Sequence, residues 1–503
     1  MRKYIIILFL VTVLIASFMP FQFLLNFAHD DSFFYIKTAS NFSKGLGSTF
    51  DGINPTNGYH PLYFISLVIL FFVPNLLFKA SPEFLYRIVV LFHLIMIIGI
   101  QFFVYKAFRN IYKYNFKKIS LLLLFILLSS FVFIRDFGLE SHLACLIISI
   151  FLYIKSKELV AGGNSILLKS LLITGLFLTR TDYIFSFIPV LLILDFYLST
   201  RRKKYILISL TVLFITVILY YTLNYLFFGN INTVSGKLLN GFPSINLKSN
   251  IDTLLIDPAK LYNQFVRIIL TIVVFVVFCF HYLKSKTKND TVSKFNLIIL
   301  GLGAGSVVFT VIHLTYNIYS IREWYMTPPV FIAIIMISIF FFNRKIILKI
   351  SLILSVILLI YVFYGSRLKN LKYVSGYEYA KSLNTIVKEN ESIYQIDYCG
   401  VIGFFSGRSV VDGDGLINSF EYLDYLKKNK IDEYISKYNI KYYSTYSTKN
   451  LLHDSIYIDD SFSDKINGKI FGFPKPSLVI EQSFKWNHIA FDLEGKWYLF
   501  KFY

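Results

Sequence analysis

Residues 29–63 have the sequence HDDSFFYIKTASNFSKGLGSTFDGINPTNGYHPLY and directly follow a long apolar run at the N-terminus. Two adjacent carboxylates, Asp30 and Asp31, therefore lie at the edge of a membrane-length segment. Ionisable groups at such an edge are costly to bury and usually face a cavity or a partner. The Asn-Gly pair and the prolines further along are typical of tight turns. We therefore expect a long folded loop at the membrane surface, with the acid pair at its start.

The rest of the chain has the composition of a polytopic α-helical membrane protein. Of its 503 residues, 56% are hydrophobic, and the mean hydropathy is +0.60. A spanning helix needs about 20 mostly apolar residues. The apolar runs predict about eleven transmembrane helices, at Tyr4–Leu25, Ile88–Tyr105, Ile119–Ile134, Gly138–Ile154, Ile166–Leu178, Tyr183–Leu198, Tyr205–Phe228, Phe265–Leu283, Phe295–Tyr316, Tyr325–Phe342 and Ile346–Gly365. We expect the first to be retained rather than cleaved as a signal peptide, because its apolar run is too long and lacks a small-residue cleavage site.

The basic residues indicate how the helices are oriented. The net charge of +20 comes mostly from short Lys and Arg clusters between the apolar runs. These clusters do not form one face with interleaved aromatic residues, which argues against nucleic-acid binding. With the predicted helices they fall on a single side, which the positive-inside rule makes cytoplasmic. The apolar run Leu62–Phe78 would break this pattern as a span, so we expect an interfacial helix there.

The same pattern predicts two domains in a multi-pass protein of the cell membrane (inner or plasma), with a cytoplasmic N-terminus. Residues 1–365 form the transmembrane domain, with the large first external loop at 26–63. Residues 366–503 form a small extracytoplasmic α/β domain, because 421–438 is helix-like and 440–446 is strand-like. The three cysteines, Cys145, Cys279 and Cys399, have neither metal-ligand nor disulfide-framework spacing.

Polar side chains at several predicted helix ends face the outer side together. Neighbouring carboxylates tend to raise one of their pKa values, which suits a general base. Cations near them suit a phosphate that accepts charge during a reaction. The acids of this candidate site are Asp30, Asp31 and Glu140, and its cations are His60, Arg180, Arg322 and Lys237.

Simpler interpretations of these residues remain open. The acid pair can cap the helix that begins SFFYIKTASNF, because a helix N-terminus favours negative charge. Arg180 can pair with Asp182, and Arg322 with Glu323. Three further histidines have no metal-ligand spacing such as HExxH. We interpret His93 as structural and leave the roles of His142 and His313 open.

Several of these stretches resemble one enzyme superfamily. Residues 30–63, GLESHLA (138–144), LFLTRTDYIF (176–185), REWYMTP (322–328) and GVIGFFSGRSVVDGDGLIN (400–418) resemble the GT-C glycosyltransferases. These include the protein O-mannosyltransferases, the aminoarabinose transferases of lipid A and a bacterial RgtA/B/C/D-like group. The resemblance implies transfer of a hexose or pentose from a polyprenyl-phosphate-linked donor, with inversion, on the extracytoplasmic face of the cell envelope. The acceptor would be a hydroxyl group of a glycan, lipid or protein.

The resemblance also implies roles for the candidate residues. Asp30 matches the general base, Asp31 its acidic neighbour, and Glu140 the second acidic position. His60 is expected at the donor phosphate; the other cations, Arg180, Arg322 and Lys237, are further candidates for it. Some relatives use a divalent metal such as Mg or Mn, which Asp30 and Glu140 would hold here, and others use none. A WWDYG-like motif is absent from the sequence, which argues against N-glycosylation of protein.

Three alternatives explain part of the pattern. A transporter or flippase for a lipid-linked or anionic solute also needs charges near the membrane, but it predicts mid-depth ionisable residues and related halves. A membrane scaffold presenting its tail to a partner gives no reason for the acids. A surface-polysaccharide polymerase or ligase with a lipid diphosphate donor is chemically closest to the main hypothesis.

Overall fold

The computed structural model describes residues 13–14, 16–112, 132–133, 136–199, 201–256, 264–284, 290–318, 321–340, 371–447, 455–458, 471–474, 477–487 and 492–502. The eleventh predicted span lies outside these residues. So do most of the third span, the first part of the first span and the predicted domain boundary at 365/366.

The other predicted spans are helices, and most have nearly the predicted bounds; the helix predicted at Ile88–Tyr105 extends further at both ends, and the one predicted at Gly138–Ile154 extends to Ala161. They are α5 (Pro82–Tyr112), α7 (Ser141–Ala161), α8 (Ile166–Thr179), α9 (Phe187–Leu198), α10 (Arg202–Phe228), α14 (Val266–Lys284), α15 (Asp290–Tyr316) and α16 (Thr327–Phe340). Among the described helices, α4, α5, α10, α14, α15 and the segment Glu323–Phe340 are long and apolar enough to cross a membrane. The chain is a polytopic α-helical membrane protein, as the hydropathy predicts.

The apolar run predicted to lie at the interface forms α4 (Pro61–Phe78). Only residues 79–81 separate α4 from α5, yet α4 packs mainly along α3 (Asp30–Ser43) and barely touches α5. It therefore does not form a transmembrane hairpin with α5, and an interfacial position remains our interpretation. One face of α4 is buried and another exposes apolar side chains at helical spacing, namely Ile65, Ile69, Phe72, Val73 and Leu76.

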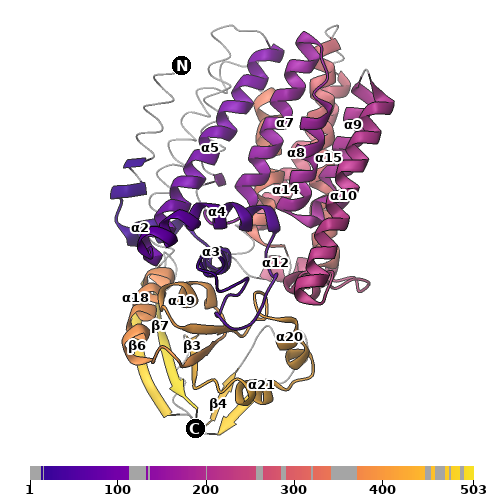
Figure 1. Cartoon of the computed structure of the whole chain (residues 1–503). Coiled ribbons are helices and arrows are strands. Elements are labelled where there is room, and N and C mark those ends of the chain that lie inside the picture. Colours follow the sequence, from indigo (N-terminus) through magenta and orange to yellow (C-terminus); the bar gives the residue numbers. More distant parts are fainter. Residues whose placement is uncertain are drawn as a thin grey trace.

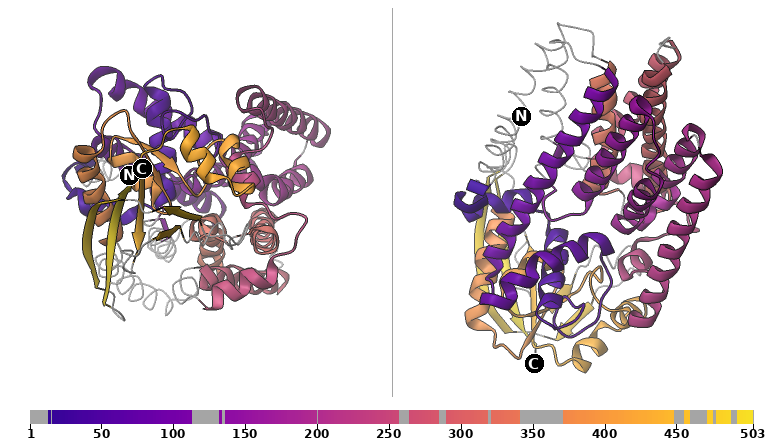
Figure 2. Two further views of the ribbon diagram at one scale, coloured as in Figure 1. Left: turned by 90° about the horizontal axis from the view of Figure 1, so that it is seen from below. Right: turned by 45° about the horizontal axis from the view of Figure 1, so that its top comes forward.

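The helical bundle and the C-terminal domain are stacked end to end. Figure 1 shows α3 and α4 between the bundle above and the sheet domain below. The right-hand view in Figure 2 places the C-terminal domain against the same end of the bundle as the first loop. The short elements α2 (Phe21–Leu24) and η1 (Leu25–Phe27) lead into α3, and α11 (Val234–Leu239) and α12 (Leu247–Ile256) follow α10.

The C-terminal domain is built on a five-stranded sheet with the order β2-β1-β3-β7-β6. Strands β1 (Ser392–Gln395), β2 (Ser409–Asp412) and β3 (Tyr442–Ser447) are parallel, whereas β7 (Asp492–Lys501) runs antiparallel to β3 and to β6 (Ser477–Asn487). Strands β4 (Ser455–Ile458) and β5 (Phe471–Pro474) form a separate pair. The predicted helix-like tail is two helices, α20 (Phe420–Lys427) and α21 (Ile431–Lys437), because the chain turns at Asn429 with a φ of 54°.

Alternation along the strands gives this sheet two buried faces. On β1, Ile393 joins the core formed with α18 (Leu371–Ile386) and α19 (Cys399–Phe405), whereas its neighbour Tyr394 packs with α20 and α21. The core on the α18–α19 side is continuous with the core of the helical bundle. The C-terminal domain and the bundle therefore share one hydrophobic core.

A buried ionic cluster joins α7, α8 and α9 at the end of the bundle away from the C-terminal domain. The ammonium group of Lys169 lies 2.7 Å from Asp195 Oδ2 and 2.8 Å from Glu158 Oε2, and Lys155 pairs with the same two acids. None of the four side chains is more than 9% exposed. Removing one partner of a buried ion pair leaves an uncompensated charge.

We expect Asp195→Asn to lower the free energy of unfolding by about 3–5 kcal/mol. The double variant Asp195→Leu/Lys169→Met removes one acid and one base and leaves Lys155 paired with Glu158, so its stability should stay near that of the wild type. Reversible unfolding in mixed micelles measures both. Equal losses in the single and double variants would contradict the ion-pair account.

Candidate active site

The acid pair begins α3, where Asp30 and Asp31 form the first turn after the N-cap residue His29. This position agrees with the capping interpretation, because the N-terminus of a helix stabilises negative charge. Successive residues of an α-helix point about 100° apart. The two carboxylates therefore face different surroundings.

Asp30 is held by the C-terminal domain. Its carboxylate accepts hydrogen bonds from the backbone N–H groups of Gly400 (3.0 Å) and Val401 (2.8 Å) at the start of α19. Its own backbone N–H donates to the hydroxyl of Tyr373 at 3.3 Å. Burial raises the pKa of Asp30 well above its usual range, although the two amide hydrogen bonds oppose this. Both oxygens of Asp30 thus have protein partners.

Asp31 faces the bundle instead. It lies one helical turn before Tyr35, whose hydroxyl donates a hydrogen bond to Glu140 Oε2 at 3.0 Å. Asp31 is partly exposed, and its carboxylate makes no hydrogen bond or ion pair with any other of the residues described above. Burial raises the pKa of Asp31, and the charge of Glu140 adds to this, whereas Arg322 opposes it. Its carboxylate is open to a ligand.

A polar network runs beside Asp31 from the start of α7 to the end of α15. Arg180 donates to Glu140 Oε1 at 2.6 Å and forms two hydrogen bonds with Asp182, at 2.7 and 3.2 Å. His313 lies 3.0 Å from Asp182, and His60 Nε2 lies 3.9 Å from Glu140. The structure therefore confirms the simpler interpretation, in which Arg180 pairs with Asp182. Two carboxylates already compensate its charge.

Arg322 differs from Arg180 in having no such compensation. It is partly exposed just before η5 (Glu323–Met326), and the described residues contain no hydrogen-bond or ion-pair partner of its guanidinium group. The alternative in which Arg322 pairs with Glu323 is not observed, because Glu323 lies 3.5 Å from His29 instead. Arg322 is close enough to Asp31 to lower its pKa. An anion can therefore bind at Arg322 without first displacing a carboxylate.

A second layer of polar residues lies behind the acid pair. His29 Nε2 lies 3.3 Å from Asp136 Oδ1, and Asp136, which is fully buried, also accepts a hydrogen bond from Thr327. The His29 ring lies 4.8 Å from Trp324. Burial lowers the pKa of His29, but Glu323 and Asp136 outweigh it and leave the pKa raised. His29 can therefore carry a positive charge beside Asp31.

Three residues singled out from the sequence lie elsewhere. Lys237 on α11 sits over the ring of Phe420 of α20 at 5.5 Å, and none of its observed contacts is with the acids. His93 is buried, with Tyr63 OH 2.8 Å and the Gly138 N–H 3.0 Å from its Nε2. It also contacts His142, so both histidines belong to this buried network.

The residues described do not fit a divalent metal well. No group of three or more His, Cys, Asp or Glu side chains suited to a metal occurs among them. Asp30 is engaged by two backbone amides, and Glu140 by Arg180 and Tyr35. The two acids that would hold a metal are therefore already engaged by protein groups.

This architecture defines a class: a bundle of membrane helices whose acid-bearing first loop lies against a small domain at one end. No protein-family model and no curated protein matches the sequence. Among solved structures, ArnT from Cupriavidus metallidurans bound to undecaprenyl phosphate aligns over 100% of this chain and 98% of that one, with a TM-score of 0.54 and 9% identity. An Archaeoglobus fulgidus oligosaccharyltransferase tethered with an acceptor peptide aligns over 88% of this chain and 69% of that one, with a TM-score of 0.47 and 11% sequence identity. The chain has the fold of the GT-C glycosyltransferases, as its sequence predicts.

Proposed function

We propose that this protein transfers a sugar from a polyprenyl-phosphate-linked donor to an acceptor hydroxyl group, with inversion at the anomeric carbon. The observation that carries the proposal is that Asp31 and Arg322 lie close enough for Arg322 to lower the pKa of Asp31, although neither side chain makes an ion pair with another described residue. Such a transfer needs a base for the hydroxyl proton and a positive charge for the phosphate that leaves.

The chemistry assigns one role to each group. The acceptor oxygen forms a bond to the anomeric carbon, and the bond from that carbon to the phosphate oxygen breaks. The hydroxyl proton passes to the Asp31 carboxylate, and the negative charge that develops on the polyprenyl phosphate is stabilised by Arg322. We assign the base to Asp31 rather than to Asp30, because the oxygens of Asp30 accept hydrogen bonds from Gly400 and Val401.

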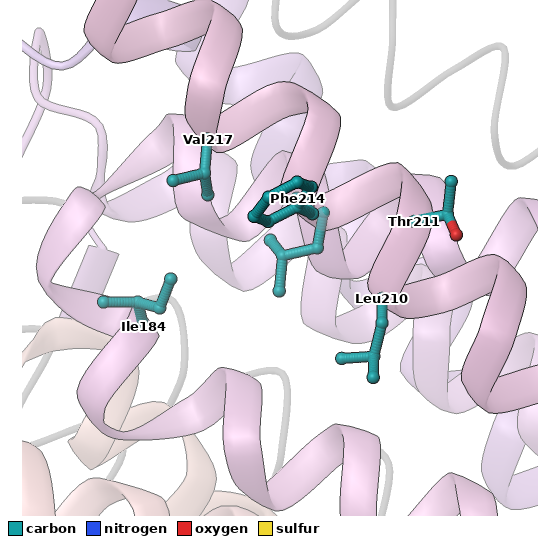
Figure 3. A pocket seen from close by; sticks show the side chains of 6 residues that line it. Ile184, Leu210, Thr211, Phe214 and Val217 are labelled. Carbon is teal, nitrogen blue, oxygen red and sulfur yellow. The ribbon is translucent and has the colours of Figure 1, made fainter.

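An apolar groove beside the polar network suits the lipid tail of the donor. It has a volume of ≈ 470 Å³ and lies between η3 (Thr181–Phe185) and α10, as Figure 3 shows. Its lining side chains are Ile184, Leu210, Thr211, Leu213, Phe214 and Val217. Ile184 is two residues from Asp182, so the groove lies next to one member of the polar network along the chain. ArnT, which shares this fold, was solved with undecaprenyl phosphate.

The orientation of the helices supports an extracytoplasmic site. Glu140 at the start of α7, Arg180 after α8 and His313 near the end of α15 lie at one end of the bundle. Basic residues gather at the opposite helix ends, including Arg109 of α5, Lys203 and Lys204 of α10 and Lys284 of α14. The positive-inside rule makes that opposite end cytoplasmic. The acid pair, α3 and the C-terminal domain would then lie outside.

We expect the purified protein in lipid nanodiscs to release free polyprenyl phosphate from one member of a panel of radiolabelled polyprenyl-phosphate sugars when a hydroxyl acceptor is present. Parallel reactions with and without a chelator decide whether a divalent metal such as Mg or Mn takes part. Polyprenyl-diphosphate sugars form a second panel, which tests for a polymerase or ligase. Movement of an intact lipid-linked sugar across proteoliposome membranes, without its cleavage, would replace the transferase proposal with a flippase.

A further inference from the structure

The C-terminal domain touches the first loop at its start. The two backbone amides of α19 that bind the Asp30 carboxylate bring Gly400 directly against Asp30. A Cβ atom at Gly400 would lie 2.2 Å from the backbone oxygen of Asp30, so only glycine fits this contact without movement. The adjacent residue, Asp31, is the proposed base.

A second contact lies at the end of the same loop. A Cβ atom at Gly58 would lie 2.2 Å from the backbone oxygen of Leu416 in the C-terminal domain. The segment that carries Leu416 is itself fixed, because Asp412 Oδ2 accepts a hydrogen bond from the Ile417 N–H at 2.9 Å. Gly58 is two residues before His60, whose side chain faces Glu140.

A third contact lies between these two. The ring of Phe50, which is 2% exposed, packs against α19 so closely that a Cβ atom at Gly403 would lie 2.4 Å from it. The other side of Phe50 packs edge-on against Phe34 of α3 at 5.5 Å. The loop is therefore in close contact with one domain at its start, middle and end.

We propose that the C-terminal domain is a brace for the first loop, which sets the positions of Asp31 and His60 by fixing both ends of that loop. Asp30 is a positioning residue in this arrangement, because it acts through Gly400 and Val401 and not on the substrate. The inference rests on the proposed function for its effect on transfer, whereas the brace itself can be tested without activity. A misplacement of about 1 Å in a catalytic group can lower a rate by about 100-fold.

The test compares Gly400→Ala and Gly58→Ala with Gly175→Ala in full-length protein in nanodiscs. At Gly175 of α8 a new Cβ atom would meet nothing nearer than 3.5 Å, so this variant is the matched control. We expect the two brace variants to lower kcat by about 100-fold while the donor KM stays close to the wild-type value. Amide hydrogen exchange should quicken within residues 30–60 and stay unchanged in α8 and α15.

Each outcome bears on the brace. If amide hydrogen exchange in residues 30–60 is as slow in both glycine variants as in the wild type, the brace proposal is wrong. It is also wrong if exchange is faster but kcat is unchanged. If neither glycine variant folds, Asp30→Asn, which enlarges no side chain, is judged by the same two measurements, with exposed Asp432→Asn of α21 as its control. If the wild type transfers no sugar from any donor, the proposed function fails, and the exchange data alone decide whether the loop is braced.

Discussion

We expect Asp31→Asn to lower kcat for sugar transfer by about 10²–10⁴-fold, the usual contribution of a positioned general base. Asparagine has nearly the size of aspartate but cannot take the proton from the acceptor hydroxyl. No hydrogen bond or ion pair of Asp31 with another described residue would be lost, and the asparagine amide oxygen can still accept from the backbone N–H of residue 31, so membrane expression and thermal stability should stay unchanged. Steady-state transfer with the donor identified in the panel measures the effect.

The pH dependence of transfer separates the two adjacent acids. The pKa of Asp31 is raised by burial, so the proposed base is ionised only above that raised value. The wild-type kcat should therefore fall as the pH is lowered through it, at a higher pH than an unperturbed carboxylate would give. Asp31→Asn should lose this limb of the profile, whereas Asp30→Asn should keep it at a lower kcat. If this limb of the pH profile disappears in Asp30→Asn but not in Asp31→Asn, Asp30 is the base and Asp31 is not.

The sequence was sufficient for the helices because their signals are local. Long apolar runs predict the bounds of α8 and α10 to within a few residues. The helix-like stretch 421–438 and the strand-like stretch 440–446 likewise indicate an α/β tail. None of these inferences requires knowledge of which segments touch.

The different surroundings of Asp30 and Asp31 could not be predicted in the same way. Helical geometry fixes the angle between the two side chains, but the partner of each depends on contacts across hundreds of residues. Asp30 meets Gly400 at a separation of 370 residues, and Tyr35 meets Glu140 at a separation of 105. A single sequence contains no signal for such pairs. For the same reason the sequence could not predict that Lys237 lies over the ring of Phe420.

We expect Arg322→Ala to lower kcat by about 10²–10³-fold, the loss seen when one preorganised donor to a developing oxyanion is removed. The guanidinium group would stabilise the phosphate as the sugar leaves it. The variant should also bind the product, polyprenyl phosphate, more weakly, so its inhibition constant should rise. Arg322→Lys keeps the positive charge but cannot form bidentate hydrogen bonds with the phosphate, so we expect its kcat to lie between those of the wild type and Arg322→Ala.

The choice between Arg322 and Arg180 follows from their existing partners. Arg180 is buried between Glu140 and Asp182, so binding a phosphate would have to compete with two carboxylates. Its removal would leave Glu140 buried without its cation and would damage the fold as well as the site. Arg202 of α10, exposed at the opposite end of the bundle, is the control for a general loss of positive charge. If Arg322→Ala and Arg202→Ala both keep the wild-type inhibition by polyprenyl phosphate, the leaving group binds elsewhere, and the pairing of Asp31 with Arg322 no longer supports a transferase.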